Sequence, residues 1–293
     1  MQSKSKISTV FIFIVLFIFV VFFIMPLLLG VFISFTDWDG IQKGFNLTGF
    51  NNYIDMIRDN RFINSTITTI KYFCILLFGS IVFGFINAKA ISKVPAIESP
   101  ALFFTFFPYI ITPVIVSILW NQMFINLFPE IGKKTGISFL ETNVLSNPNY
   151  ALLAIGIVDL WILIPFSMIL FYSALQTIPE NLRDAAKLDG ANNPKILFYI
   201  EVPYLLPTVG MIIVLVLSRA LTNIESIMVL TSGGPMRATE TVYYTIFRNS
   251  TEELHYAYGL AEGIVVSIVI IIVYSLVQKY IISKHLDDLK SYE

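Results

Sequence analysis

At residues 178–207 the chain reads IPENLRDAAKLDGANNPKILFYIEVPYLLP, and the rest of the sequence is organised around this stretch. It is the longest charged and interrupted segment between two strongly apolar runs. Pro179 fits the first turn of a helix, where its missing N–H costs little. Gly190 fits the left-handed residue that ends such a helix. The stretch therefore predicts a helix that starts near Pro179 and ends in a tight turn.

The second half of this stretch predicts another short helix. Asn193 and Pro194 are typical of an N-cap and a first helical position. Pro203 and Pro207 are expected to end that helix and to lead into the next apolar run. Residues 178–204, called the hook below, are therefore interpreted as helix, turn and short helix standing outside the apolar runs.

The first predicted helix carries a face of small residues. The residues that share this face by their spacing are Leu182, Ala185, Ala186 and Asp189. Its two alanines would allow another surface to approach closely. Glu180 lies in the first turn, where a carboxylate suits the positive end of the helix dipole.

The hook resembles the cytoplasmic coupling loop of the permease subunits of binding-protein-dependent ABC importers. That family has Glu-Ala-Ala, three further residues and Gly, followed by a proline-rich exit. Here DAAKLDGA precedes EVPYLLP, with Asp184 in place of the usual Glu. An amphipathic loop of an unrelated transporter is the alternative interpretation. The resemblance implies that a cytosolic ATPase docks on Glu180, Asp184, Ala185, Ala186, Leu188, Asp189 and Gly190.

Composition places the chain in a membrane. Its 293 residues are 56% hydrophobic and only 13% charged, with a mean hydropathy of +0.76. Soluble domains carry about 25% charged residues. The net charge of −1 gives no sign of a nucleic-acid partner. The lipid bilayer is therefore the expected surroundings.

Six apolar runs are long enough to cross a bilayer as helices, which predicts an all-α integral membrane fold in one domain, residues 1–293. The first run is longer than a signal-peptide core of roughly 7–15 residues, so it is expected to be retained. Six spans place both termini and the hook on one side, which a weak excess of Lys and Arg favours as cytoplasmic. The expected spans are residues 10–33, 63–88, 101–124, 150–175, 206–230 and 258–282.

The resemblance extends over nearly the whole chain. SFTDWDG (residues 34–40), TSGGP (231–235) and AYGLAEG (257–263) are similar to motifs of the larger permease subunit of carbohydrate importers, with Glu262 where that family usually has a small residue. The resemblance implies a bacterial inner-membrane protein that forms a heterodimer with a second, homologous permease. It also implies two cytosolic ATPase subunits and an extracytoplasmic solute-binding protein that delivers a carbohydrate.

No catalytic motif is found in the sequence. A P-loop needs GxxxxGK followed by Ser or Thr, and no such run occurs. No HExxH or GxSxG run occurs either, and the two histidines are far apart in sequence. We therefore expect no enzyme activity, no metal and no cofactor in this chain. ATP and Mg²⁺ are expected to be used by the partner ATPase subunits.

Charged residues inside the spans are the candidates for a substrate path, because a charge at the bilayer centre costs about 2.5–3.5 kcal/mol on insertion scales. Asp159 and Arg219 are expected near mid-membrane, and either they line a sugar cavity or they form a buried pair that locks spans four and five. Tryptophan faces can stack on sugar rings. The candidate path residues are Trp120, Asn121, Asp159, Trp161, Asn223, Glu225 and Glu262.

A second class of function competes with the ABC importer. A secondary transporter driven by an ion gradient could use Asp159 or Glu262 as its proton carrier. Six spans are few for such a transporter, and the hook would then have no role. A structural scaffold would leave the charges inside the spans unexplained.

Overall fold

The computed structural model describes residues 2–94 and 98–279, and all their regular structure is helical except for one isolated β-bridge between Thr36 and Leu47. This confirms the predicted all-α membrane fold. Six helices in the described part of the chain are long and apolar enough to cross a membrane: Phe11–Ile33, Asn60–Ile91, Pro113–Thr135, Ala151–Thr177, Asn193–Thr222 and Tyr256–Val277.

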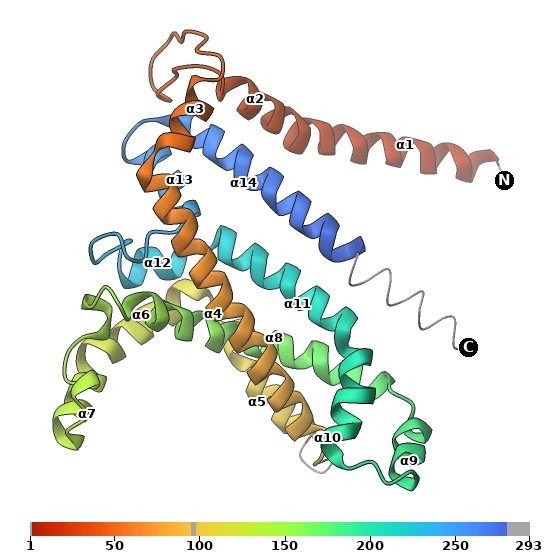
Figure 1. Ribbon diagram of the computed structural model, residues 1–293. Helices are drawn as coiled ribbons and strands as arrows, with labels where there is room; N and C mark the ends of the chain where they lie inside the picture. Colours follow the sequence, from red (N-terminus) through yellow and green to blue (C-terminus); the bar gives the residue numbers. More distant parts are fainter. Residues whose placement is uncertain (1, 95–97, 280–293) are drawn as a thin grey trace. The chain divides into compact units, whose positions relative to one another are not determined.

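The chain divides into two compact units, and Figure 1 labels their helices. The first unit consists of Met1–Ile63 and Thr245–Ile268, and the second consists of Asn64–Tyr244 and Val269–Glu293. Helices of the first unit, or beginning or ending in it, are α1 (Gln2–Phe19), α2 (Met25–Ile33), α3 (Asn51–Arg58), the start of α4 (Asn60–Ile91), α13 (Val242–Thr251) and α14 (Tyr256–Val277).

In the first unit, the segment after α2 folds back onto α3. Asn52 on α3 donates its Nδ2 to the carbonyl oxygens of Ser34 and Thr36, at 2.8 Å each. The ring of Phe35 packs edge-on against that of Phe50 and lies beside that of Tyr53. The segment SFTDWDG, residues 34–40, is therefore a connection held to α3 by hydrogen bonds and ring contacts.

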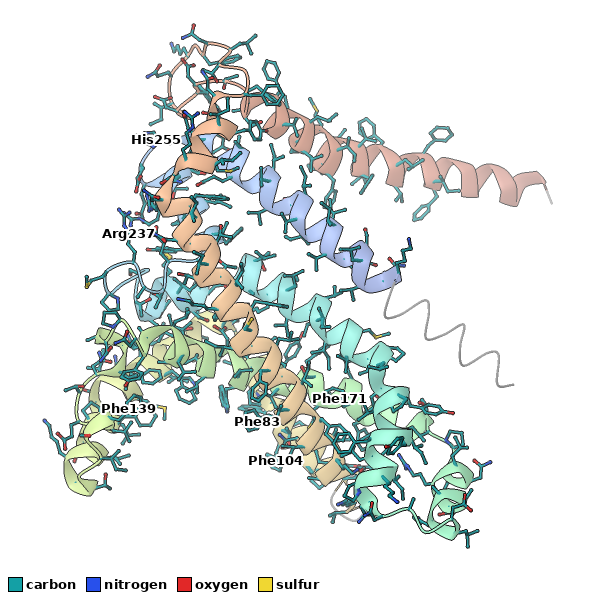
Figure 2. All side chains as sticks on the ribbon, in the orientation of Figure 1. Phe83, Phe104, Phe139, Phe171, Arg237 and His255 are labelled. Carbon is teal, nitrogen blue, oxygen red and sulfur yellow. The ribbon has the colours of Figure 1, made fainter. Side chains whose placement is uncertain are left out.

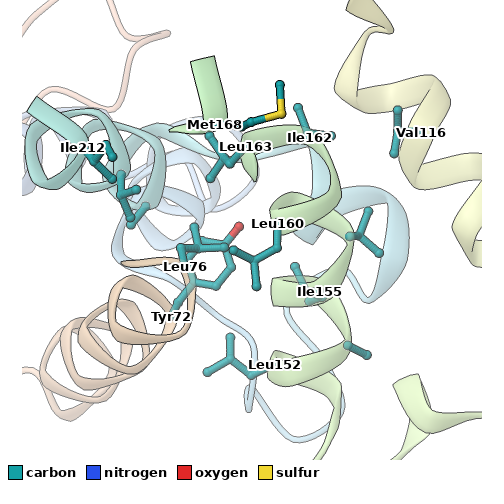
Figure 3. Packing of buried hydrophobic residues seen from close by; sticks show 14 of the residues in the cluster. Tyr72, Leu76, Val116, Leu152, Ile155, Leu160, Ile162, Leu163, Met168 and Ile212 are labelled. Carbon is teal, nitrogen blue, oxygen red and sulfur yellow. The ribbon is translucent and has the colours of Figure 1, made fainter. Parts of the chain in front are cut away.

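The second unit is built around α8 (Ala151–Thr177), the most deeply buried of the six membrane helices. Figure 3 shows Tyr72 and Leu76 of α4 (Asn60–Ile91) beside Ile155 and Leu160 of α8. Glycines allow this close approach, because a Cβ on Gly79 would lie 2.4 Å from Leu160 Cδ1. The other helices of the second unit are α5 (Glu98–Ile110), α6 (Pro113–Gln122), α7 (Phe128–Thr135), α9 (Glu180–Leu188), α10 (Asn193–Ile196), α11 (Val202–Thr222) and α12 (Glu225–Leu230).

The expected third span, residues 101–124, is not one continuous helix. The chain breaks between α5 and α6, where Thr112 has an extended backbone (φ −61°, ψ 138°) before Pro113. A residue that precedes proline is pushed out of the helical region, which explains the break. The helix that begins at Pro113 continues to Thr135, well beyond the expected end of the span at residue 124.

Three π-helical turns each end two residues before a proline. In each turn, the residue just before the proline donates its N–H to the carbonyl five residues back. Proline lacks an N–H and collides with the carbonyl four residues earlier, so the wider turn accommodates it without ending the helix. The turns and their prolines are Val20–Ile24 with Pro26, Met123–Leu127 with Pro129, and Leu197–Glu201 with Pro203.

The π turn before Pro203 corrects two predictions, one about the hook and one about the fifth span. Pro203 and Pro207 do not end the second hook helix, which runs on from Asn193 to Thr222 as a single membrane helix. Its N-cap is Asn192, one residue earlier than expected. The fifth span therefore begins before residue 206, and it ends at Thr222 rather than at residue 230, because Asn223 is extended (ψ 116°).

Candidate functional site

The hook is capped at its turn as its sequence predicts. Gly190 has a φ of +80°, and the N–H of Ala191 donates to the carbonyl of Ala186 at 2.9 Å. Asn192 then caps the following helix by accepting the N–H of Lys195 on its Oδ1, at 3.1 Å. Glu180 lies in the first turn of α9. The two hook helices are therefore joined by a turn whose geometry is locally determined.

The residues expected to dock an ATPase are almost all on the surface. Six of the seven are exposed and Ala186 is half-buried, and Figure 1 shows α9 standing apart from the membrane helices of its unit. The side chain of Leu188 is 89% exposed, and Tyr199 in the same hook is 80% exposed. Exposed apolar side chains on a short capped helix are typical of a protein-binding surface.

The second unit contains a buried polar cluster centred on Asp159, which is fully buried. Oδ1 of Asp159 accepts hydrogen bonds from Arg219 Nη2 and from Ser226 Oγ, at 2.9 Å each. Oδ2 accepts from Asn223 Nδ2 at 2.9 Å and from the Tyr72 hydroxyl. Four donors therefore satisfy one carboxylate, as buried charge requires. We call Tyr72, Asp159, Arg219, Asn223 and Ser226 the Asp159 cluster.

The break between α11 and α12 forms this cluster. Asn223 occupies the extended residue at the break, and its Oδ1 also accepts the backbone N–H of Ser226 at 3.4 Å. Arg219, one turn earlier on α11, lies 3.9 Å (Nη1) from Glu225 Oε2 at the start of α12. The half-buried Glu225 is thus a neighbour of the cluster that solvent can reach.

The two tryptophans expected on the path are in contact with each other. Their rings, Trp120 on α6 and Trp161 on α8, meet edge to face at a centroid distance of 6.2 Å. Trp161 is 38% exposed, and Asn121 is half-buried. Two positions along a helix correspond to about 200° of rotation, so Trp161 and Asp159 point to opposite faces of α8. The expected path residues of α8 therefore belong to two different surfaces.

Glu262 lies in the first unit, fully buried on α14. Its Oε2 accepts from Asn249 Nδ2 at 2.8 Å, while its Oε1 has no hydrogen-bond partner in the described part of the chain. Arg61 donates through Nη1 to Asn249 Oδ1 (3.1 Å) and to Glu253 Oε1 (2.7 Å). The carboxylate is therefore next to a polar network but is not itself ion-paired among these residues.

A hollow of about 580 Å³ lies beside this network in the first unit. Trp38, Asp39 and Arg61 are among the residues lining it, as is His255, which lies between α13 and α14 (Figure 2). Backbone N–H groups of Gln42 and Ile41 lower the pKa of Asp39 below its ordinary value, so its carboxylate stays charged at neutral pH. The hollow is consequently polar and acidic.

No protein-family model matches the chain. The chain is 34% identical over 265 residues to the multiple sugar-binding transport system permease protein MsmF of Streptococcus mutans, and the match covers 90% of this chain and 91% of that relative. The chain belongs to the ABC importer permease family. It is a multi-pass membrane subunit and not an enzyme.

Other members of the ABC importer permease family align over similar lengths. The probable starch degradation products permease AmyD of Thermoanaerobacterium thermosulfurigenes is 26% identical, over 89% of this chain and 88% of its own. The sn-glycerol-3-phosphate permease UgpA of Escherichia coli O157:H7 is 26% identical over 90% of each chain. In a crystal structure of a bacterial ABC transporter for alginate import, one chain matches with a TM-score of 0.79 at 18% identity, covering 95% of this chain and 97% of that one.

Sequence reasoning about this ABC permease missed Tyr72 and Ser226 in the Asp159 cluster. Ser226 follows Asn223 by three residues and Arg219 by seven, so it shares their helical spacing. Helical spacing does not predict that the helix ends before Asn223. Tyr72 gave a weaker signal, because it is one of six hydroxyl-bearing residues in the second span, residues 63–88.

Proposed function

We propose that this chain forms half of the membrane pathway through which an ATP-driven importer takes up a carbohydrate. Two observations support the substrate class: the multiple-sugar and starch-product permeases among its relatives, and the contacting pair Trp120 and Trp161. An extracytoplasmic solute-binding protein delivers the carbohydrate. The complex of the alginate transporter with a periplasmic protein carrying an alginate pentasaccharide supports this partner.

The assembly that we propose contains a second, homologous permease in a heterodimer and two cytosolic ATPase subunits. These ATPase subunits bind and hydrolyse ATP with Mg²⁺, and this chain binds no cofactor. Six crossings place both termini and the hook on the same side of the inner membrane, and docking of the hook on a cytosolic ATPase makes that side the cytoplasm of a bacterial cell.

The exposed hook is the observation that carries this proposal. Leu188 and Tyr199 are 89% and 80% exposed on the hook, and in this proposal a docked ATPase covers them. We assign Glu180, Asp184, Ala185, Ala186, Leu188, Asp189 and Gly190 to the ATPase-docking surface. ATP closes the ATPase pair, the hook moves with it, and the membrane helices change their access from one side to the other.

The substrate path that we propose uses the accessible candidates. Trp120, Asn121, Trp161 and Glu225 are partly exposed and are available to a passing sugar. Asp159 and Asn223 are fully buried and hydrogen-bonded within one cluster, which supports a structural pair of Asp159 with Arg219 behind the path. Glu262 is kept as a proposed path residue of the first unit alone, where it is fully buried beside Asn249.

The test is co-purification of the tagged chain with the products of its neighbouring genes in mild detergent. We expect an ATPase to be retained by the parent chain and lost from Leu188→Asp. The matched control is Met236→Asp, which adds the same charge at an apolar side chain that is 90% exposed in the loop after α12. Loss in both variants, or in neither, would contradict hook docking.

An uptake assay in proteoliposomes separates this proposal from its alternative. The importer is expected to accumulate a labelled starch product such as maltotriose, or another sugar carried by its binding protein, only with ATP inside. Accumulation by the chain alone under a proton gradient would instead support a secondary transporter. In that case the buried carboxylates Asp159 and Glu262 would become the carriers to test.

A further inference from the structure

The middle of the hook is held to the membrane helices by very few contacts. Ile178 and Ile196 are buried at its two ends, but no side chain of residues 179–195 is buried. Apolar packing therefore fixes the two ends of this segment, whereas α9, which lies between them, has no buried side chain. A helix attached in this way moves independently of its neighbours unless polar contacts hold it.

Arg183 supplies those polar contacts. Its Nη2 donates to the carbonyl oxygen of Leu175, in the last turns of α8, at 3.1 Å. Its Nε lies 3.7 Å from Glu201 Oε1, in the π turn that leads into α11. Other polar contacts of residues 179–195, such as the ion pair of Lys187 with Asp184, stay within the hook. Arg183 therefore connects α9 to two membrane helices.

Glu201, the ion-pair partner of Arg183, also contacts a third membrane helix. Its side chain is only 8% exposed, and its Oε2 accepts from Lys89 Nζ, in the last turn of α4, at 2.5 Å. The Lys89 ammonium also lies 5.7 Å from the ring centroid of Phe85. A buried carboxylate is stable only with its charge compensated, so both bases are held near Glu201.

We propose that Arg183, Glu201 and Lys89 form an ionic tie through which α9, α11 and α4 move as one body. Movement of the hook then reaches two membrane helices at once, and a hook without the tie would swing freely. Arg183 and Glu201 are positioning residues, acting through the helices they join. The inference rests on the proposed function, because it takes a docked ATPase to be what moves the hook.

The structure indicates variants that remove the tie and keep the fold. Glu201→Gln removes the buried charge and still offers Lys89 an acceptor, while Arg183 and Lys89 (29% and 28% exposed side chains) can reach water. Arg183→Gln leaves Glu201 paired with Lys89. The matched control is Glu130→Gln, which breaks the exposed 2.7 Å ion pair with Lys134 on α7.

Distances between spin labels measure the tie directly. The full chain, with its one cysteine removed by Cys74→Ser, is labelled at Asn181→Cys on α9, an exposed residue outside the proposed docking surface, and at Met211→Cys on α11, in lipid nanodiscs. We expect one narrow distance in this parent and in Glu130→Gln. We expect a broad distribution in Arg183→Gln and in Glu201→Gln. Because the two residues act as one unit, the double variant should be no broader than the broader single.

Two results would overturn the tie: a narrow distance that persists in both single variants, or a broad distance already present in the parent. Retention of the ATPase is measured on the same tagged variants and answers a separate question. If the parent chain retains no ATPase, the proposed function fails, and the label distances still decide whether the tie exists. If the ATPase is retained and the distances do not respond, only the tie is wrong.

Discussion

Arg219 on α11 donates to Asp159 on α8 over 2.9 Å, and this ion pair joins two membrane helices at a fully buried carboxylate. The pair does not stand alone, because Tyr72, Asn223 and Ser226 fill the remaining acceptor positions of Asp159. A charge so placed is compensated locally and is not free to bind a solute. The geometry favours the buried-pair interpretation of these two residues.

Removal of the cation from this cluster is expected to be costly. Arg219→Leu leaves the Asp159 carboxylate buried without its counter-charge, and breaking a buried pair from one side typically costs about 3–5 kcal/mol. Thermal unfolding of the purified chain in detergent should show a large fall in melting temperature. The double variant Asp159→Leu with Arg219→Leu should lose less than the sum of the two single variants.

The control for this prediction is an exposed ion pair of the same length. Asp184 and Lys187 are 2.9 Å apart with side chains 56% and 61% exposed, and such pairs contribute about 1 kcal/mol or less. Asp184→Asn should therefore leave the melting temperature nearly unchanged. A fall equal to that of Arg219→Leu would show that burial is not the reason for the effect.

Local sequence signals predicted the hook turn well, and the breaks within spans poorly. Gly190 was identified because only one residue type readily adopts its backbone conformation, and its φ of +80° confirms this. The break at Asn223 has no such marker, since Asn is tolerated in several conformations. It depends on the side-chain contacts of Asn223 with Asp159 and Tyr72, which lie 64 and 151 residues away in sequence.

The effects of two prolines on helix continuity were predicted wrongly, in opposite ways. Pro113 begins a new helix inside the expected span 101–124, whereas Pro203 lies in a helix that was expected to end. Thr112 before the first proline is extended, and a π turn precedes the second. Sequence alone does not distinguish these two solutions, because both satisfy the missing N–H. Packing of the flanking residues decides between them.

Close packing of α4 on α8 should make Gly84 intolerant of even one methyl group. A Cβ at Gly84 would lie 2.8 Å from Ser167 Cβ and 3.3 Å from the backbone nitrogen of Met168, and a backbone atom cannot move aside easily. Gly84→Ala is expected to destabilise the chain by about 1–3 kcal/mol, as overpacked cores do. Melting temperature and the amount of protein in the membrane report the effect.

The matched substitution is Gly263→Ala on α14, where no atom lies within 4 Å of the added Cβ. Alanine there should be neutral or stabilising by up to about 1 kcal/mol, because glycine is a poor helix former. If both variants fell equally in melting temperature, close packing would not be the cause at Gly84.

The connection between α13 and α14 should lose stability in acid. Burial raises the pKa of Glu253, but the hydrogen bond and charge of Arg61 outweigh it, and the resulting pKa lies below the ordinary 4.5. A carboxyl group whose pKa is lower in the folded state than in the unfolded state stabilises the fold when the pH is above its unfolded-state pKa. This contribution disappears as the pH falls through its folded-state pKa. The melting temperature should therefore fall below about pH 4.5.

Glu253→Gln identifies the source of this pH dependence. The variant removes the titrating group, so its melting temperature should be lower at neutral pH and should change less between about pH 7 and about pH 3. Glu141→Gln serves as the control, because the Glu141 side chain makes no hydrogen bond or ion pair within residues 2–94 and 98–279. A pH profile of Glu253→Gln that parallels the parent would exclude Glu253 as the titrating group.

Two glycines with similar backbone conformations allow the effect of a hook substitution on stability to be distinguished from its effect on ATPase binding. Gly190 ends the first hook helix at φ +80° and Gly136 ends α7 at φ +72°, and a Cβ on either would meet no atom within 4 Å. Valine at either position is strained only by its backbone, at about 1–2 kcal/mol. Gly190→Val and Gly136→Val should therefore lower the melting temperature by similar amounts.

Only Gly190→Val should also weaken ATPase retention, since it reshapes the turn beside Leu188 and Asp189. Equal retention by the two variants would separate the hook turn from ATPase docking, even if both chains remained folded in the membrane.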